Sequence, residues 1–286
     1  MAGNTVTSRN TVTNGNSDTM GGALLLVTVA TLATWMAVGQ GPQASLFLEE
    51  TRLKIRRIGS SYGGWTFRPD LLNNASIVYS FGLGSDISWD SQLIGAIGCE
   101  VHGFDNTPVS NKYLEKQLAG DRLPPGFLWH KFLLSDHDGV VEMMLPTGHS
   151  ASYAETTTGQ ATGFKANSAH TARGYTIGSI MRKLNHTRID VLKMDIESSE
   201  FKIFNAILNN GPDTVPPVHR LPVCQLLVEF HSRLSPKGYA SKAQTLLSLH
   251  TLGFELVHNV VQRDSADNAM FVNFRFCSSA TLLTPT

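Results

Sequence analysis

The residues best placed to do chemistry in this chain stand where short apolar runs end. Asp105 and Asp195 each follow such a run directly, and Glu229 lies near the end of another. Runs of this length are typical of buried parallel strands, and parallel α/β sheets bind ligands beyond the carboxyl ends of their strands. A carboxylate at that edge can accept hydrogen bonds or take up a proton. We therefore expect these acids to meet in one site.

A pair of glycines belongs to the same expected site. Gly82 and Gly84 come directly after the apolar run at 76–81 and before a helical pattern. Glycine in such a turn lets the backbone approach a ligand closely. Asp105 follows at about the 20-residue spacing at which an acid accepts hydrogen bonds from both hydroxyls of an adenosine ribose. The combination predicts a cofactor that contains adenosine.

The residues after the glycine pair favour one class of adenosine cofactor. A dinucleotide site normally has a third glycine, so that the pyrophosphate can lie on the helix N-terminus. Asp86 and Ile87 stand there instead, and an acid would repel pyrophosphate. S-adenosylmethionine has no phosphate and carries a cationic sulfonium, so it tolerates the acid. The sequence therefore favours methyl transfer over hydride transfer.

Strand and helix patterns alternate after residue 75, which predicts an α/β fold with a doubly wound sheet. Strands are expected at 76–81, 99–104, 128–134, 137–145, 189–194, 223–230, 254–262 and 269–276. Helices are expected at 89–97, 111–118, 175–184, 199–208 and 243–252. Residues 147–172 have no period and predict a mobile loop.

Five segments resemble, in this order, the FkbM-type class I S-adenosylmethionine-dependent methyltransferases. They are VYSFGLGSDISWD, CEVHGFDNTP, FLLSDHDGVVEM, IDVLKMDIESSEF and QLLVEFH, and the resemblance covers about residues 76–276. It implies a seven-stranded, mostly parallel, Rossmann-like sheet and methyl transfer, usually to a hydroxyl oxygen of a small molecule, glycan or lipid.

The resemblance also implies cofactor-binding roles. Gly82 and Gly84 would lie under the methionine part of S-adenosylmethionine, Asp105 would hold the ribose, and Ser135 and Asp136 would lie at the adenine edge. Two positions depart from the family pattern. Ser80 stands where an acid commonly precedes the first glycine, and Ser198 replaces the glycine of D-I-E-G.

Catalysis is expected from Asp195, Glu229 and His231, which end neighbouring strands. Methyl transfer to a hydroxyl needs a base within hydrogen-bond reach, and we expect His231 or Asp195 as the base and Glu229 as the group that orients the acceptor. Alternatively, Glu229 and His231 bond loop backbone. Ser198 is the expected N-cap of the next helix, and Glu197 is expected to cap that helix or face the sheet. Only Asp195 and Glu229 could be named as metal ligands, so no metal is predicted.

The N-terminal part has a different composition. Residues 1–20 predict a disordered tail, and residues 21–39 form an uncharged apolar segment long enough to cross a bilayer about 30 Å thick. A cleaved signal peptide and a buried helix are the alternatives to a transmembrane anchor. Residues 40–75 are expected to be a stem, residues 76–277 the methyltransferase domain, and residues 278–286 a C-terminal tail.

The side of the membrane stays open. Basic residues at 52–57 favour a cytoplasmic domain, whereas sequons at Asn74 and Asn185 would suit a lumenal one. An endomembrane or plasma-membrane protein fits either arrangement. The three cysteines are most simply buried thiols, although one pair could be bridged in a lumenal domain.

Composition excludes one class of partner and leaves two rival functions. Equal numbers of basic and acidic residues argue against nucleic-acid binding, which depends on phosphate neutralisation. Asp136-His137-Asp138 matches the D-x-D motif of membrane-anchored nucleotide-sugar glycosyltransferases, although a turn between two strands also explains it. The other rival is a non-catalytic tethered module, because fold does not determine function.

Overall fold

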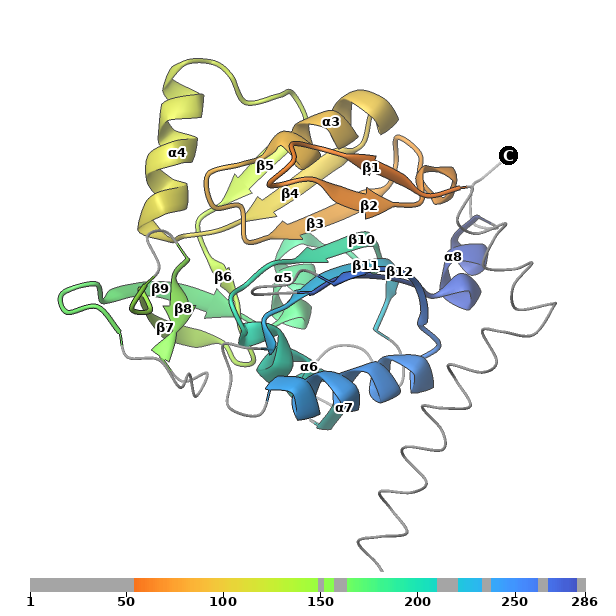
Figure 1. The fold of residues 1–286 in the computed structure, drawn as a ribbon. Helices are drawn as coiled ribbons and strands as arrows, with labels where there is room; N and C mark the ends of the chain where they lie inside the picture. The colour runs from red at the N-terminus through yellow and green to blue at the C-terminus, as the bar shows by residue number, and fades with distance from the viewer. Residues whose placement is uncertain are drawn as a thin grey trace, which may run out of the picture. The chain divides into compact units, whose positions relative to one another are not determined.

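A computed structural model describes residues 54–148, 152–156, 164–209, 221–232, 238–261 and 267–281, and its centre is a seven-stranded sheet (Figure 1). Within these ranges, no helix combines the length and the apolar character that a bilayer crossing requires. The predicted anchor at 21–39 lies outside the described residues.

The central sheet has the strand order β12-β13-β11-β10-β3-β4-β5. Its strands are β3 (Ile77–Phe81), β4 (Glu100–Phe104), β5 (Phe127–His130), β10 (Ile189–Met194), β11 (Val223–Phe230), β12 (Glu255–Val261) and β13 (Asp267–Val272). β5, β4, β3, β10 and β11 pair in parallel, and β13 runs antiparallel to both of its neighbours. The predicted seven-stranded, mostly parallel sheet is confirmed. Strand order reverses between β3 and β10, which places the ligand crevice of such a sheet at their carboxyl ends.

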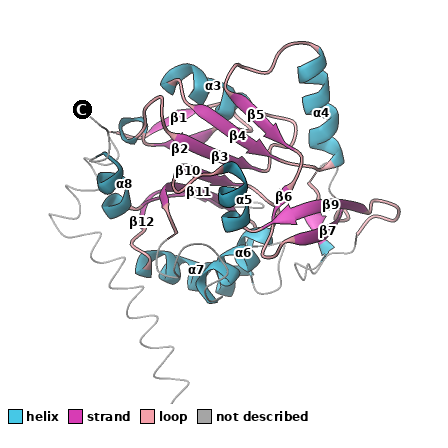
Figure 2. Cartoon of the chain, turned by 180° about the vertical axis from the view of Figure 1, so that it is seen from behind, coloured by secondary structure: helices cyan, strands magenta, loops and turns pink. Residues whose placement is uncertain are grey.

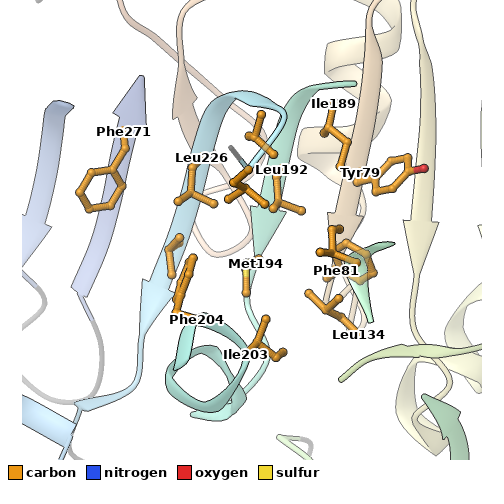
Figure 3. Packing of buried hydrophobic residues seen from close by; sticks show 14 of the residues in the cluster. Tyr79, Phe81, Leu134, Ile189, Leu192, Met194, Ile203, Phe204, Leu226 and Phe271 are labelled. Carbon is orange, nitrogen blue, oxygen red and sulfur yellow. The ribbon is translucent and has the colours of Figure 1, made fainter. Parts of the chain in front are cut away.

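Apolar side chains cover both faces of the sheet, which is why its central strands read as continuous apolar runs. All six residues of β10 are buried. On one face, Tyr79, Leu192 and Phe204 belong to a cluster of buried side chains (Figure 3). On the other face, Val191 packs in a second cluster with Trp89.

The helices are α3 (Ser88–Ile97), α4 (Pro108–Ala119), α5 (Ile177–Leu184), α6 (Ser199–Asn209), α7 (Gly238–Thr251) and α8 (Phe274–Thr281), with a 3-10 turn at Pro69–Leu71. α5, α6 and α7 supply buried residues to the cluster of Figure 3, and α3, α4 and α8 to the other. Several of these helices begin or end at residues that favour a helix terminus. Gly98 ends α3 in the left-handed region, and the hydroxyls of Thr107 and Thr176 accept N–H groups at the starts of α4 and α5.

The folded domain begins before the predicted boundary at residue 76. β1 (Arg56–Ile58) and β2 (Trp65–Phe67) form an antiparallel pair, and Ile58, Trp65 and Phe67 are buried in the core. The pair is held to the sheet by Gln225 of β11, which accepts from Arg68 N at 2.8 Å and donates to Arg68 O at 3.0 Å. Part of the expected stem is therefore core.

A second sheet lies beside the central one (Figure 2). It has the order β6-β9-β7-β8, with β6 (Leu133–Leu134), β7 (Gly139–Met144), β8 (Ala154–Glu155) and β9 (His170–Tyr175). The single strand predicted at 128–134 was wrong, because β5 ends at His130 and β6 pairs in the second sheet.

The mobile loop predicted at 147–172 was also wrong in part, since it contains β8 and the start of β9. In β9 the buried positions hold Ala172 and Gly174, so the alternation of the strand has little hydrophobic signal. A Cβ on Gly174 would lie 2.5 Å from Cγ2 of Val141, so close packing requires the small residue.

The last residues that the structure describes form a helix. α8 crosses the predicted tail boundary at 278, and Cys277 in this helix forms a disulfide with Cys224 of β11. Cys99 is a buried free thiol. The interpretation of all cysteines as buried thiols therefore holds for Cys99 and is wrong for the other two.

Histidines pack against the core at β4 and β5. His102 Nδ1 lies 3.0 Å from His130 Nε2, and Tyr79 Oη lies 2.8 Å from His186 Nδ1. Burial, together with the neighbouring His130 and His186, lowers the pKa of His102 to about 4. His102 is therefore held neutral in the fold, whereas an unfolded histidine takes up a proton below about pH 6.5.

We expect this difference in proton uptake to make the fold sensitive to acid. The contribution of His102 is fully present above about pH 6.5 and is lost as the pH falls towards 4, up to about 3 kcal/mol. Urea unfolding of wild type and His102→Gln at pH 7.5, 5.5 and 4.5 measures it. The variant should lose less stability over this range, and equal pH slopes would contradict the expectation.

Candidate active site

A cavity of about 360 Å³ opens at the carboxyl ends of the central strands. This volume lies within the range of small-molecule sites. Its wall brings together the turn after β3, Asp105 after β4, Asp195 and Glu197 after β10, and Glu229 and His231 at the end of β11. The expectation that the acids at the strand ends share one site is met for Asp105, Asp195 and Glu229.

The turn after β3 has the tight backbone that its glycines predict. Gly82 has φ 77° and Gly84 has φ 52°, both in the left-handed region. A Cβ on Gly82 would lie 1.7 Å from the carbonyl oxygen of Asp195, so this turn packs directly on the end of β10. A Cβ on Gly84 would meet no atom within 4 Å. Gly84 therefore leaves room beside the cavity, as a cofactor cradle requires.

Asp105 organises the glycine turn. Its Oδ2 accepts the N–H groups of Leu83 at 3.0 Å and Gly84 at 3.1 Å, and its Oδ1 accepts from Thr107 N at 2.8 Å. Burial raises the pKa of the carboxyl, and these N–H groups act in the opposite direction. Asp105 also lines the cavity, where its carboxylate could accept a hydrogen bond from a ribose hydroxyl. Spacing did not predict the bonds to the turn.

Lys193 is a cavity residue that the sequence analysis missed. It is buried in β10, its Nζ donates to the carbonyl of Gly82 at 3.0 Å, and it lies 5.2 Å from the ring centre of Trp65. Asp90, buried in α3, is near enough for Lys193 to lower its pKa, although burial raises that pKa overall. A lysine between Leu192 and Met194 in an expected buried strand was the available signal, since buried lysines are rare.

Opposite charges gather around His231, which is buried. Its Nδ1 lies 2.9 Å from Oε1 of the fully buried Glu200, and its Nε2 faces oxygens of Glu197 at 3.5 Å, Asp195 at 3.8 Å and Glu229 at 3.9 Å. We call these five residues the acid–histidine cluster.

The cluster shifts the pKa of its members. Burial alone would lower the pKa of His231, but Glu200, Glu197 and Asp195 raise it well above its ordinary value. Burial and the charge of Asp195 raise the pKa of Glu229 to about 8. Such shifts are common where groups are arranged for chemistry.

The start of α6 differs from the prediction. Glu197 and Ser198 have positive φ values of 54° and 74°, and the hydroxyl of Ser198 has no hydrogen-bond partner among the residues that the structure describes. The predicted N-cap at Ser198 was therefore wrong. Glu200 Oε1 accepts from Ile196 N at 3.1 Å instead, which leaves Glu197 at the cavity.

Ser135 and Asp136 do not line this cavity. Asp136 Oδ1 lies 2.8 Å from His137 Nδ1 and 3.2 Å from Lys202 Nζ. Asp138 accepts from Ser179 Oγ at 2.6 Å and Thr176 N at 2.8 Å. The two acids of the D-x-D motif thus have separate structural partners, as the turn interpretation of this motif expects. The predicted role of Ser135 and Asp136 at the adenine edge stays a prediction.

The second sheet supplies another part of the cavity wall. Val141, Met143 and Tyr153 line the cavity, as does Glu155, which is buried and paired with Lys202 of α6. Ser199 Oγ donates to Glu155 at 3.2 Å. These contacts tie β8 to α6, and neither Glu155 nor Lys202 was predicted from sequence.

Comparison with known proteins identifies this arrangement. A family model described as "Methyltransferase FkbM domain" matches residues 76–256. The chain is 29% identical over 161 residues to "Probable methyltransferase-like protein 24" of Homo sapiens. The aligned region covers 56% of this chain and 33% of that protein. For the protein of the same name from Rattus norvegicus, identity is 30% over 159 residues, covering 54% and 32%. The match thus takes in about a third of the length of these relatives.

Two solved structures that resemble this chain do so at low sequence identity and low TM-score. TrmK of M. capricolum, in complex with S-adenosyl-homocysteine, has a TM-score of 0.38 at 10% identity, covering 72% of this chain and 65% of that one. Fibrillarin of Aeropyrum pernix, with natively bound S-adenosyl-L-methionine, has a TM-score of 0.36 at 11% identity, covering 71% and 68%.

The family match spans most of the sheet and the residues that form the cavity wall at its edge. It begins just before β3, includes the glycine turn, Asp105 and the acid–histidine cluster, and ends in β12. The chain therefore belongs to the family of methyltransferase FkbM domains, for which S-adenosylmethionine is the methyl donor.

Proposed function

We propose that this domain transfers a methyl group from S-adenosylmethionine to a hydroxyl oxygen of a small molecule, glycan or lipid. The observation that carries the proposal is one cavity with two kinds of wall. The glycine turn ordered by Asp105 forms one part, and the acid–histidine cluster forms another. A donor and an acceptor could therefore be held side by side.

The residues present fit the cofactor. Bound S-adenosylmethionine would supply a methyl group on a cationic sulfonium. Gly84 leaves the backbone open to a ligand, and Asp105 lines the same cavity, where its carboxylate can accept a hydrogen bond from a hydroxyl. Asp195 and Glu197 line the same cavity, and their carboxylates favour a cation.

The acid–histidine cluster would prepare the acceptor. Glu200 holds the ring of His231 in one orientation, so that Nε2 faces the carboxylates of the cavity wall. Asp195, whose side chain is 32% exposed, is the most accessible carboxylate of the cluster. These groups can accept a hydrogen bond from a hydroxyl and take its proton, while the apolar wall at Val141 and Met143 limits water.

Calorimetry with S-adenosylhomocysteine on the full chain tests the proposal. We expect Asp105→Ala to weaken binding at least tenfold, because the turn loses the acceptor of two N–H groups and the ribose loses a carboxylate. Glu115→Gln, an exposed acid paired with Lys131, should bind as wild type does.

Two outcomes would contradict the proposed function. Failure of the wild type to bind S-adenosylhomocysteine, with binding of uridine diphosphate and manganese instead, would favour the glycosyltransferase. Binding without turnover on any hydroxyl-bearing acceptor pool would favour a tethered module.

We further propose that residues 21–39 anchor the protein in a membrane and that the domain lies on the lumenal or extracellular side. The Cys224–Cys277 disulfide supports an oxidising compartment, and the sequon residues Asn74 and Asn185 are both exposed. Protease protection in sealed microsomes tests the arrangement, and digestion of the domain without detergent would contradict it.

A further inference from the structure

Asp195, Glu197 and His231 converge on one point of the cavity wall. Each offers one ligand atom, and these atoms all lie within 4.8 Å of one another. His231 Nε2 is 3.5 Å from Glu197 Oε2 and 3.8 Å from Asp195 Oδ1. Around an ion with bonds of about 2.1 Å, neighbouring and opposite ligand atoms are about 3.0–4.2 Å apart. We propose that these three side chains form a binding site for a divalent metal ion.

The surroundings of His231 are a second, independent observation. The residue is 5% exposed, and its Nδ1 is paired with Glu200, which is fully buried. Metal-binding histidines usually donate their second ring N–H to a carboxylate in this way, which orients the other nitrogen towards the metal. The carboxylate oxygens nearest to Nε2 of His231 lie 3.5–3.9 Å from it, at or beyond the limit of a hydrogen bond. A buried nitrogen is thus aimed at carboxylates that it does not bind closely.

The charge of the acid–histidine cluster favours a cation. Its acids are Asp195, Glu197, Glu200 and Glu229, and within the described ranges the ion pairs of these acids are with His231. Lys193 lines the same cavity, but its Nζ donates to backbone carbonyls. A divalent ion would bind these acids in their ionised form and remove the repulsion among them.

The ligand types indicate which ion fits. Carboxylate oxygens suit Mg²⁺ and Mn²⁺, whereas imidazole suits first-row transition metals and Zn²⁺. One histidine with two carboxylates therefore favours Mn²⁺ or Zn²⁺ over Mg²⁺. Three protein ligands leave coordination positions open. If the proposed function holds, an acceptor hydroxyl could bind the ion there, and this last step alone rests on that function.

Electron paramagnetic resonance of Mn²⁺ tests the site on the full chain after removal of metals with a chelator. We expect one Mn²⁺ per chain, displaced by Zn²⁺. His231→Gln and Glu197→Gln should each weaken Mn²⁺ binding at least tenfold, because each removes one of three ligands. Glu200→Gln should weaken it about tenfold through the orientation of His231. Glu115→Gln is the matched control and should leave it unchanged.

Circular dichroism separates loss of the site from loss of the fold. If His231→Gln unfolds, Glu197→Gln carries the test, since the side chain of Glu197 is 21% exposed and its replacement is close in size. Absence of Mn²⁺ binding by the wild type, or equal binding by a folded Glu197→Gln variant, would overturn the site. Either result alongside normal S-adenosylhomocysteine binding leaves the methyltransferase proposal intact. Mn²⁺ binding without S-adenosylhomocysteine binding would support the metal site and contradict the proposed function.

Discussion

Gly82→Ala is expected to lower the free energy of unfolding by about 3 kcal/mol or more and to abolish S-adenosylhomocysteine binding. The added Cβ would lie 1.7 Å from the carbonyl oxygen of Asp195 and 2.7 Å from its carbonyl carbon. Neither atom can move without shifting the end of β10. The φ of 77° adds strain for any residue with a Cβ. Urea unfolding followed by circular dichroism measures the loss.

Gly84→Ala is the matched control, two residues away in the same turn. Its Cβ would meet no atom within 4 Å, so only the strain of φ 52° remains, about 1–2 kcal/mol. The added methyl group lies at the cavity edge and should still weaken cofactor binding. Equal unfolding free energies for the two variants would show that the clash with Asp195 is relieved at little cost.

Removal of the Cys224–Cys277 disulfide is the second large effect. The bond joins residues 53 apart in sequence, and it fixes α8 to β11 within the core. Closing a loop of this length restricts the unfolded chain, so reduction should cost about 2–4 kcal/mol. Urea unfolding of the wild type with and without dithiothreitol measures the difference.

Two variants control for side effects of the reductant. The double variant Cys224→Ala/Cys277→Ala should resemble the reduced wild type and should not respond to dithiothreitol. Cys99→Ala, which removes the buried free thiol, should keep the response of the wild type. An oxidised wild type with the same denaturant midpoint as the reduced protein would contradict the assignment of the bond.

Local patterns were enough for much of the fold. The run at 189–194 is β10 with the predicted bounds, because a strand buried on both faces of a sheet is rich in apolar residues. Gly98 ends α3 as expected, because the left-handed backbone at a helix end favours glycine. The sequence pattern did not predict β9 or α8. Small residues form the buried face of β9, and the placement of α8 depends on a disulfide to a strand 53 residues away.

The candidate site divides in the same way. Strand-end position was enough to select Asp105, Asp195, Glu229 and His231, since parallel strands bring their carboxyl ends to one edge. The hydrogen-bond partners of these residues were not predicted. The bonds of Asp105 to the glycine turn and of His231 to Glu200 join segments far apart in sequence, and residue spacing carries no information about their orientation.

By itself, the sequence determined the α/β class, the family and the edge of the sheet at which the site lies, because each depends on the order and composition of short segments. Only the tertiary structure decided which groups meet within that edge. It brought Lys193 under the glycine turn, Glu197 into the cavity and Glu200 behind His231. The physical reason is that hydrogen bonds and ion pairs act over a few ångströms, and the folded backbone alone sets those distances.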